Sequence, residues 1–439
     1  MKTLGIVGGG ITGLTCAYKL QHEFNVTVFE QDNHWGGHAQ THRIGDAEVE
    51  AGVAVAGELT YKEFFKLMRE INFDKFISYE LSGFRVHAQG ETLLYFDTNA
   101  KRLRQLMPKF LKESPASIFK TIKLVPFIYR LYRDYRKGLL DDVMVMDAYE
   151  MYPRYSEQVA TVLTVLSLIT AVSLKNVSIG HIFNFIFDTE NNHGWTDPIS
   201  ELLKTFKYTK IPEGGVGAYI NRLREKTTAS FNIGSGITKV ERNEDGTITV
   251  VNKDGKFFRF DHVIVATQPF QAASFLEYID EEEREIFTKL ANFVTHSIVT
   301  NHTDSGVLDH IDPAYGLVDY RIDSHDDVSQ VTIVKADHYY TSQLLPDSVD
   351  PKKIKKGGFS NAQFTPDNYS INPEKILTQH IHGTQQMMPE TRQLFDKLIE
   401  RSGEGNLYFA CAALSNYPTS QEGGVRSALR VVKELKNNN

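Results

Sequence analysis

The sequence predicts an α/β fold that begins with a doubly wound, dinucleotide-binding unit. Three features near the N-terminus support this prediction: an apolar strand at residues 3–7, a glycine-rich turn at residues 8–13, and a second strand with β-branched residues at residues 25–30. Residues 12–22, between the turn and the second strand, have the pattern of a helix. A strand, a helix and a strand in this order are typical of a parallel sheet covered by helices.

The composition is that of an ordinary globular protein. The chain has 439 residues, with 48 Lys and Arg against 55 Asp and Glu, and 41% of its residues are hydrophobic. These values exclude a disordered, collagen-like or coiled-coil chain, and the length predicts two or three structural units. The mild acidity argues against nucleic acid as a partner. Cys16 and Cys411 are the only cysteines, which excludes a disulfide scaffold and favours a reducing, cytoplasmic location.

The turn at residues 8–13 has the G-x-G-x-x-G spacing. Gly8 allows the tight turn, Gly10 lets the backbone approach a pyrophosphate, and Gly13 lets the helix pack against the strand. The phosphates then bind the free N–H groups at the helix N-terminus. Glu30, at the end of the next strand, is placed to accept hydrogen bonds from ribose hydroxyls. The predicted nucleotide-binding residues of this segment are Gly8, Gly10, Ile11, Thr12, Gly13, Glu30 and Gln31.

The rest of the chain is predicted to be helical first and rich in strands later. Residues 61–206 are largely helical in pattern, and strand signals return after Pro212. Residues 159–174 are the most apolar stretch, but they are too short to span a bilayer, which needs about 20 apolar residues, so we expect a buried helix. The later predicted strands are 230–233, 237–242, 247–251, 257–260, 262–266, 297–300, 315–320, 330–334 and 408–410, and the later helices are 280–292 and 421–435.

A glycine pair at Gly36-Gly37 follows Glu30 closely, and His38 comes next. Such a pair suits a backbone that passes close to a cofactor's diphosphate and ribose. Together with the turn at residues 8–13, these residues resemble the flavin-containing amine oxidase superfamily of FAD enzymes, which also holds phytoene-desaturase-like, protoporphyrinogen-oxidase-like and fatty-acid double-bond isomerase members. The resemblance implies FAD as the cofactor, with Gly36, Gly37 and His38 among the residues that bind it.

Four later segments continue the resemblance. Residues 211–219 are similar to the family's Pro-x-Gly-Gly segment, and residues 237–241 look like the strand whose backbone meets the adenine. Residues 263–269 look like the strand that ends at a small-residue turn. Residues 421–428 resemble the C-terminal flavin segment, in which a helix N-terminus points at the flavin's pyrimidine edge. The cofactor-binding residues implied in these segments are Val240, Thr267, Glu422 and Gly423.

The resemblance also implies a division into two domains. A Rossmann-type FAD-binding domain is discontinuous and comprises residues 1–60, 207–279 and 405–439. An α+β substrate domain comprises residues 61–206 and 280–404. Each domain is therefore built from segments that lie far apart in the sequence.

Two candidates for catalysis lie in the expected substrate domain. Some members of the superfamily use a lysine near flavin N5, and Lys335 is the candidate here, with a surface strand lysine as the alternative interpretation. His302 is a candidate pocket residue. It lies in residues 301–304, which together with residues 192–194 are similar to a bacterial branch of predicted NAD/FAD-binding oxidoreductases.

Departures from the superfamily bear on the substrate. Cys411 stands where a glycine is usual, and Tyr417 is alone where most amine oxidases have an aromatic pair. We therefore expect an FAD-dependent oxidoreductase that takes hydride from an apolar, lipid-like substrate onto flavin N5. The open alternatives are an FAD-dependent fatty-acid double-bond isomerase, a small-amine oxidase, and a non-catalytic protein that binds FAD or lipid.

Residues 101–138 carry eleven basic residues against two acidic ones, with aromatic residues between them. A solvated basic helix face is one interpretation. Peripheral contact with an anionic membrane is the other, because each Lys or Arg near such a surface contributes about 1 kcal/mol. Nucleic acid is not an expected partner.

Two histidine patterns are not expected to bind metal. His34, His38 and His42 recur every four residues, but the glycine pair between them breaks the helix that this spacing requires. His380 and His382 would share one face of a strand, and we interpret them as a surface pair. No metal site is predicted.

Overall fold

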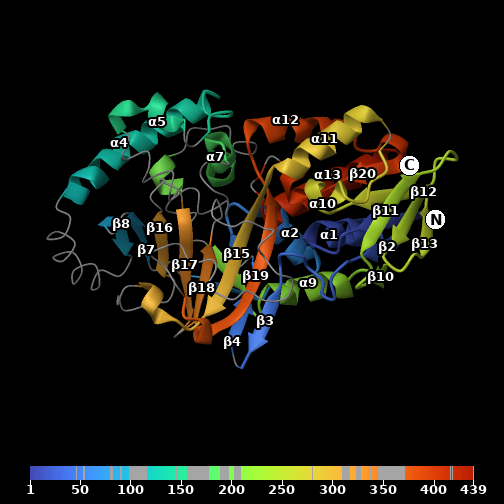
Figure 1. The fold of residues 1–439 in the computed structure, drawn as a ribbon, viewed down its shortest axis with the longest axis horizontal. Helices are drawn as coiled ribbons and strands as arrows, with labels where there is room; N and C mark the ends of the chain where they lie inside the picture. The colour runs from blue at the N-terminus through green and yellow to red at the C-terminus, as the bar shows by residue number, and fades with distance from the viewer. Residues whose placement is uncertain are drawn as a thin grey trace.

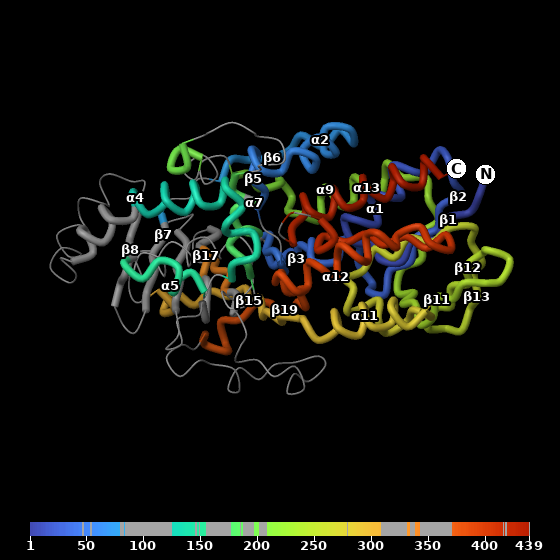
Figure 2. The backbone as a smooth tube through the Cα atoms, turned by 90° about the horizontal axis from the view of Figure 1, so that it is seen from above, coloured from blue at the N-terminus to red at the C-terminus, as the bar shows by residue number. Residues whose placement is uncertain are grey.

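A computed structural model gives the fold of the chain (Figure 1). It describes residues 1–45, 47–52, 55–79, 83–88, 91–97, 116–144, 147–155, 177–187, 197–201, 209–278, 280–308, 317–322, 328–336, 339–344, 371–415, 417 and 419–438. The described part is elongated, with both termini at one end and a large sheet at the other (Figure 2).

The terminal end is built on a five-stranded parallel sheet with the strand order β10-β2-β1-β14-β20. Its strands are β1 (Lys2–Val7), β2 (Phe24–Phe29), β10 (Ser230–Asn232), β14 (His262–Val265) and β20 (Leu407–Phe409). The strands come from three separate parts of the chain, and the crossover from β1 to β2 contains α1 (Ile11–Leu20). The predicted α/β class with a parallel central sheet is confirmed.

Both faces of this sheet are buried. On β14, Ile264 packs in a cluster with residues of α1 and of α13 (Gln421–Asn437). Its neighbours Val263 and Val265 face the opposite way and pack with α11 (Glu281–Asn292) and α12 (Pro389–Glu400). Successive strand residues point to opposite faces, so a continuous apolar run such as this one is typical of a parallel strand between two helical layers.

The other end contains a seven-stranded sheet with the order β19-β15-β18-β17-β16-β7-β8. Its strands are β7 (Gly83–Ala88), β8 (Glu91–Asp97), β15 (Val294–His302), β16 (Leu317–Ile322), β17 (Val328–Ala336), β18 (Tyr339–Leu344) and β19 (Ile376–Gln385). All neighbours are antiparallel except β16 and β7. The long strands β15 and β19 run from this sheet toward the parallel one (Figure 1).

Smaller elements complete the fold. The remaining strands are β3 (Thr41–Ile44), β4 (Ala47–Glu50), β5 (Ala56–Gly57), β6 (Phe76–Ser78), β9 (Thr209–Pro212), β11 (Ile237–Arg242), β12 (Ile248–Asn252) and β13 (Phe257–Phe260). The remaining α-helices are α2 (Lys62–Glu70), α4 (Ala116–Arg136), α5 (Ala148–Met151), α7 (Ile179–Phe187), α9 (Val216–Glu225) and α10 (Pro269–Ala272).

The predicted elements after residue 229 are found within a few residues of their expected bounds. In residues 61–206 the described helices are α2, α4, α5 and α7, and the strands β6, β7 and β8 lie among them. These three strands and β19 were not expected. The sequence near β7 and β8 does not show their partner, because β7 pairs with β16, which lies far along the chain.

None of the described helices is long and apolar enough to cross a membrane. The apolar stretch at residues 159–174 and the start of the basic stretch, residues 101–115, lie outside the described residues.

Candidate functional site

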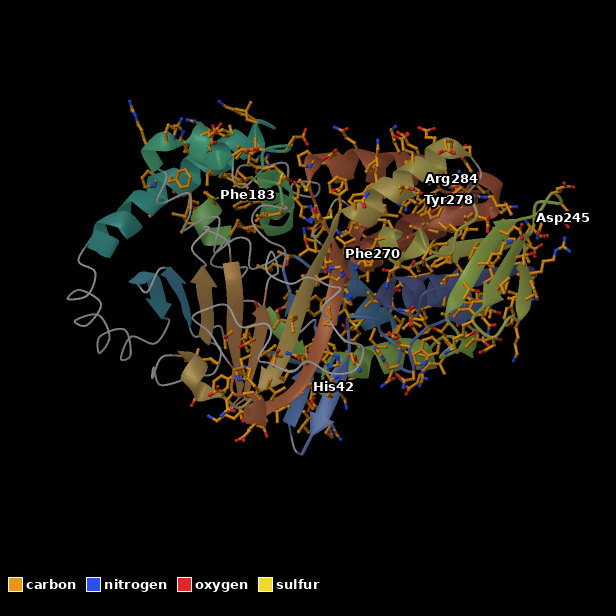
Figure 3. The ribbon with its side chains drawn as sticks, viewed as in Figure 1. His42, Phe183, Asp245, Phe270, Tyr278 and Arg284 are labelled. Carbon is orange, nitrogen blue, oxygen red and sulfur yellow. The ribbon has the colours of Figure 1, made fainter. Side chains whose placement is uncertain are left out.

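A cavity of about 730 Å³ lies between the parallel sheet and the strands β15 and β19. Segments far apart in the sequence line it: the β1–α1 turn, residues 29–40, residues 266–275, β19, and residues 411–421. Figure 3 shows Phe270, one of the lining residues, near the middle of the molecule, and His42 beside β3 and β19. The carboxyl ends of β1, β2 and β14 meet at this cavity, which is where doubly wound folds bind ligands.

The turn after β1 needs its glycines for two different reasons. Gly8 has φ +111, and a Cβ on Gly13 would lie 2.0 Å from the Gly8 carbonyl oxygen, so helix α1 packs directly on the turn. A Cβ on Gly10 would have only the Gly36 carbonyl oxygen near it, at 3.9 Å. Gly10 therefore presents open backbone to the cavity, together with Ile11 and Thr12.

Glu30 lies directly after β2 and lines the cavity, as does Gln31. Its carboxylate accepts hydrogen bonds from the N–H groups of Gly9 at 2.8 Å and Asp32 at 3.0 Å. Only 6% of the residue is exposed, and burial raises the pKa of the carboxyl above its ordinary value, although both hydrogen bonds oppose the rise. Since a carboxylate has about four lone-pair sites, it keeps acceptor capacity for a ligand's hydroxyls.

The glycine pair rests on the first turn. The Gly36 N–H donates to the Gly9 carbonyl at 2.9 Å, and Gly36 forms a parallel bridge with Gly10. Both glycines of the pair have positive φ, +110 at Gly36 and +58 at Gly37. The two turns therefore form one glycine-lined wall, with His38 next to it on the cavity.

Four buried polar groups in the cavity wall have no hydrogen-bond partner among the described residues. They are the hydroxyls of Thr267 and Thr419, the amide nitrogen of Gln421 and Nε2 of His380. Gln421 begins α13, whose capping residue Ser420 accepts from the Gly423 N–H at 3.2 Å. Buried polar groups normally have hydrogen-bond partners, so these groups and the glycine-lined wall fit a cofactor with many polar atoms.

Two other predicted cofactor residues face elsewhere. The carboxylate of Glu422 is fully buried, accepts from the N–H groups of Glu63 and Phe64 at 3.2 and 2.8 Å, and pairs with Arg426 at 2.6 Å. It therefore caps the start of α2. The backbone of Val240 bonds residues 275 and 277, and Val240 is not among the residues that line the cavity.

His302 is fully buried in β15 and is not among the lining residues. The Asp304 N–H donates to its Nδ1 at 3.2 Å, so Nε2 carries the proton and donates to the Ser342 hydroxyl at 2.8 Å. Burial lowers the pKa of His302 to about 4. Lys335 lies in β17, and its side chain lies outside the described part of the structure.

The sequence did not reveal that several histidines line the cavity. His296 on β15 and His380 and His382 on β19 line the cavity with His34 and His38. The interpretation of His380 and His382 as a surface pair was therefore wrong. Alternation along the strand gave them a shared face, but the turn after β2 covers that face. Among the described residues, no group of three or more His, Cys, Asp or Glu is arranged to hold a metal ion.

The fold and cavity define a protein that binds a dinucleotide cofactor at the edge of a parallel sheet. A family model, flavin containing amine oxidoreductase, matches residues 11–300, and the chain belongs to this family. It is therefore an FAD-dependent oxidoreductase. Bound FAD supplies a two-electron acceptor. No curated protein matches the sequence.

Solved structures with this fold include proteins of different activities. A CLA-producing fatty acid isomerase from P. acnes is 13% identical, with a TM-score of 0.66 over 99% of this chain and 98% of that one. Cyclohexylamine oxidase from Brevibacterium oxydans is 14% identical, with a TM-score of 0.64 over 99% of each chain. A candidate protoporphyrinogen oxidase from Exiguobacterium sp. is 15% identical, with a TM-score of 0.67 over 100% of this chain and 99% of that one. At these identities the similarity concerns the fold.

Proposed function

We propose that this chain oxidises an apolar, lipid-like substrate by transfer of hydride to flavin N5. The observation that carries the proposal is a single cavity that extends from the nucleotide turn at Gly8 and Glu30 to the wall formed by His296 and His382. Such a cavity lets a cofactor held at one end meet a substrate at the other. The chain's own contribution is to bind, to orient and to exclude water.

The surroundings of Tyr417 argue against a small cationic amine. Tyr417 is 1% exposed, and the guanidinium carbon of Arg426 lies 3.8 Å from its ring centroid. An aromatic ring attracts a cation at its face, and this face already has an internal cation. An aromatic cage that includes Tyr417 is therefore unsuited to a substrate ammonium group.

The described part of α4 supports contact with lipid. Val125 and Tyr129 are exposed large apolar side chains, at 46% and 38%, and the same helix carries Arg130 and Arg133 on its exposed surface. Exposed apolar groups beside cations suit the boundary of an anionic membrane. We propose peripheral membrane contact through residues 101–138, in a protein that is otherwise cytoplasmic.

The proposal keeps the two-domain division. Residues 1–60, 207–279 and 405–439 form a Rossmann-type FAD-binding domain, and residues 61–206 and 280–404 form the substrate domain. Lys335 stays the proposed basic group near flavin N5. His302, whose two ring nitrogens are both engaged, is proposed to hold β15 against β18.

The experiment is anaerobic mixing of the holoenzyme with fatty acyl compounds, isoprenoids and small primary amines. Lasting bleaching of the flavin by the lipid-like compounds, and none by the amines, is the expected result. A shifted double bond in the product with the flavin still oxidised would identify the isomerase instead. Turnover of an amine without any lipid response would overturn the proposed substrate class.

Membrane contact is tested by co-sedimentation with anionic liposomes. The variant Arg130→Glu/Lys137→Glu should sediment less than the wild type, and salt should abolish sedimentation of the wild type. The matched control, Lys253→Glu/Lys256→Glu, makes the same charge change at exposed positions near the β12–β13 turn. Equal loss in both double variants would contradict a specific role for α4.

A further inference from the structure

Four histidines form a continuous group of rings beside the cavity. The rings of His38 and His382 have centroids 4.5 Å apart, and those of His42 and His380 lie 4.6 Å apart and nearly parallel, at 17°. The rings of His380 and His382 are 6.3 Å apart on the same face of β19. We call these four residues the imidazole cluster. His38, His380 and His382 line the cavity, so the cluster lies at the cofactor's wall.

The chain holds one ring of the cluster in a defined tautomer. His382 Nε2 lies 2.5 Å from the Ala51 carbonyl oxygen, and a carbonyl only accepts, so Nε2 carries the proton. Nδ1 of His382 is then unprotonated. A Cβ on Gly52 would lie 3.1 Å from Nε2 and 2.8 Å from the His38 carbonyl oxygen. Glycine at position 52 therefore leaves room for this contact.

Burial favours the neutral form of the four imidazoles as long as no further negative charge enters the cavity. Burial lowers the pKa of His38 to about 3 and of His380 to about 4, and it also lowers those of His42 and His382. Proximity adds to this, because His42 and His382 each lower the pKa of His380 when protonated. A proton on one ring therefore opposes a proton on the next.

Few other charges face the cluster. His34 precedes the glycine pair, His296 comes from β15, and the carboxylates of Glu30 and Asp32 line the nucleotide end of the cavity. The Glu50 carboxylate, from β4, accepts from the Thr41 hydroxyl and the Val216 N–H. Among the described lining residues there is no Lys or Arg. The N-terminus of α13 supplies only a partial positive charge.

Reduction of the flavin adds negative charge to this cavity. FAD is an extended molecule, so with its adenosine end at Glu30 its ring end would reach toward the β19 side of the cavity. An added charge within about 4–6 Å shifts a pKa by about 1–3 units in favour of the opposite charge. Among the described residues that line the cavity, the imidazoles are the titratable groups that can become positive.

We propose that the imidazole cluster takes up one proton from solvent when the bound flavin receives two electrons. The balance is two electrons and one proton on the flavin, and a second proton on an imidazole nitrogen of the cluster. Reoxidation returns both electrons to the acceptor and releases both protons. The inference rests on the proposed function, in which the bound flavin is reduced in this cavity. Its test needs no substrate. A failure of this inference can therefore be distinguished from a failure of the proposed substrate class.

The test is the midpoint potential of the holoenzyme's flavin as a function of pH, with dithionite as the reductant. For a two-electron couple, a tenfold change in proton concentration shifts the potential by about 30 mV for each proton taken up. A pKa of about 4 raised by about 3 units lies near 7, so we expect about 60 mV per pH unit between about pH 5 and 7 in the wild type. A wild-type slope of about 30 mV per pH unit would overturn the proposal.

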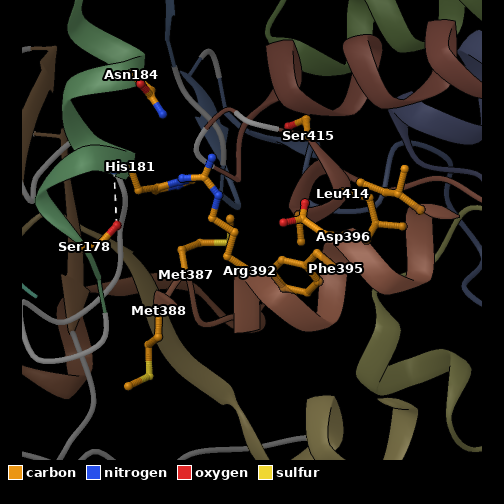
Figure 4. A pocket seen from close by; sticks show the side chains of 12 residues that line it. Ser178, His181, Asn184, Met387, Met388, Arg392, Phe395, Asp396, Leu414 and Ser415 are labelled. Carbon is orange, nitrogen blue, oxygen red and sulfur yellow. Dashed lines mark hydrogen bonds between the residues drawn. The ribbon is translucent and has the colours of Figure 1, made fainter. Parts of the chain in front are cut away.

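The variant His38→Gln/His382→Gln should bring the slope toward about 30 mV per pH unit. His181→Gln is the control, because burial also lowers the pKa of His181 to about 3, and its Nε2 is buried with no hydrogen-bond partner among the described residues. Figure 4 shows His181 on α7 beside a separate cavity of about 30 Å³ that also includes Met387 and Arg392. An unchanged slope in the double variant, or an equal change in the control, would contradict the proposal.

A second measurement covers the case in which the double variant does not retain FAD. Nitrogen-15 NMR of wild-type holoenzyme labelled at histidine distinguishes neutral from protonated rings. Reduction at pH 7 should convert one cluster ring, assigned by single variants at His380 and His382, to the protonated form. If every cluster ring stays neutral on reduction, the inference is wrong, whatever the variants do.

Discussion

The two ends of the cavity are built in different ways. At the nucleotide end, the hydrogen bonds of Gly9 with Glu30 and Gly36 join residues that are close in the sequence. At the other end, His38 and His42 meet His382 and His380, which lie hundreds of residues away. The first end follows from a local motif, and the second only from long-range pairing of strands. We therefore expect that single substitutions of glycine disrupt the nucleotide end. We expect that the histidine end is affected mainly by changes in charge.

The largest expected effect is at Gly13. A Cβ there would lie 2.0 Å from the Gly8 carbonyl oxygen, and neither backbone can move without separating α1 from β1. Gly13→Ala should lower the free energy of unfolding by about 5 kcal/mol and abolish FAD binding. Urea unfolding and the flavin content of the purified protein measure the two effects.

Gly10→Ala is the matched control for this prediction. A Cβ on Gly10 would face the open cavity, with its nearest neighbour 3.9 Å away. The apoprotein should lose about 1 kcal/mol or less, while FAD affinity falls because the methyl group occupies space at the diphosphate. If both variants were destabilised equally, the distinction between Gly13 as a packing residue and Gly10 as a cofactor-binding residue would be wrong.

The next largest effects are expected at two buried carboxylates, Glu422 and Glu30. Glu422→Gln leaves Arg426, whose side chain is 15% exposed, beside a neutral amide, and should lower the free energy of unfolding of the apoprotein by about 3 kcal/mol. Glu30→Gln should instead weaken FAD binding by about 1.5–3 kcal/mol, which is about tenfold to a hundredfold in affinity. Urea unfolding and fluorescence titration with FAD separate the two outcomes. The reverse assignment would place Glu422 at the cofactor and Glu30 in the packing.

The strand, turn and helix at the glycine-lined end of the cavity could be predicted from the sequence because their information is local. The strand at residues 3–7, the spacing of its glycines and the acid at position 30 are all visible within a short window. Alternation also placed His380 and His382 on one face. Whether that face meets solvent or a cavity depends on residues 38–52 and on β15, which no local pattern contains.

Glu422 is a second residue whose side-chain contacts could not be predicted from a local pattern. The C-terminal motif predicted its place at the start of a helix, and α13 begins there. The direction of its carboxylate depends on α2, whose first N–H groups it binds. The element could be predicted from the sequence, but the partner of its side chain could not.

The smallest expected effect concerns acid stability, in which a buried imidazole and two buried carboxylates oppose each other. Burial holds the pKa of His302 at about 4, so between pH 6.5 and 4 the unfolded chain binds a proton that the folded chain does not. Its contribution to stability is present above pH 6.5 and is lost as the pH falls toward 4. Glu30 and Glu422 have raised pKa values, so their contribution is present below their ordinary pKa and is lost as the pH rises.

The variant His302→Gln tests this balance through a slope. It should reduce the change of unfolding free energy between pH 6.5 and 5 by up to about 1.4 kcal/mol per pH unit, which is the free energy linked to one proton. The substitution itself destabilises at every pH, because Ser342 and Asp304 lose their ring partner, so the slope and not the absolute value carries the information. Urea unfolding at several pH values provides it, with His22→Gln at an exposed position as the control. An unchanged slope would mean that buried carboxylates such as Glu30 and Glu422, rather than the buried neutral imidazole of His302, govern the response to acid.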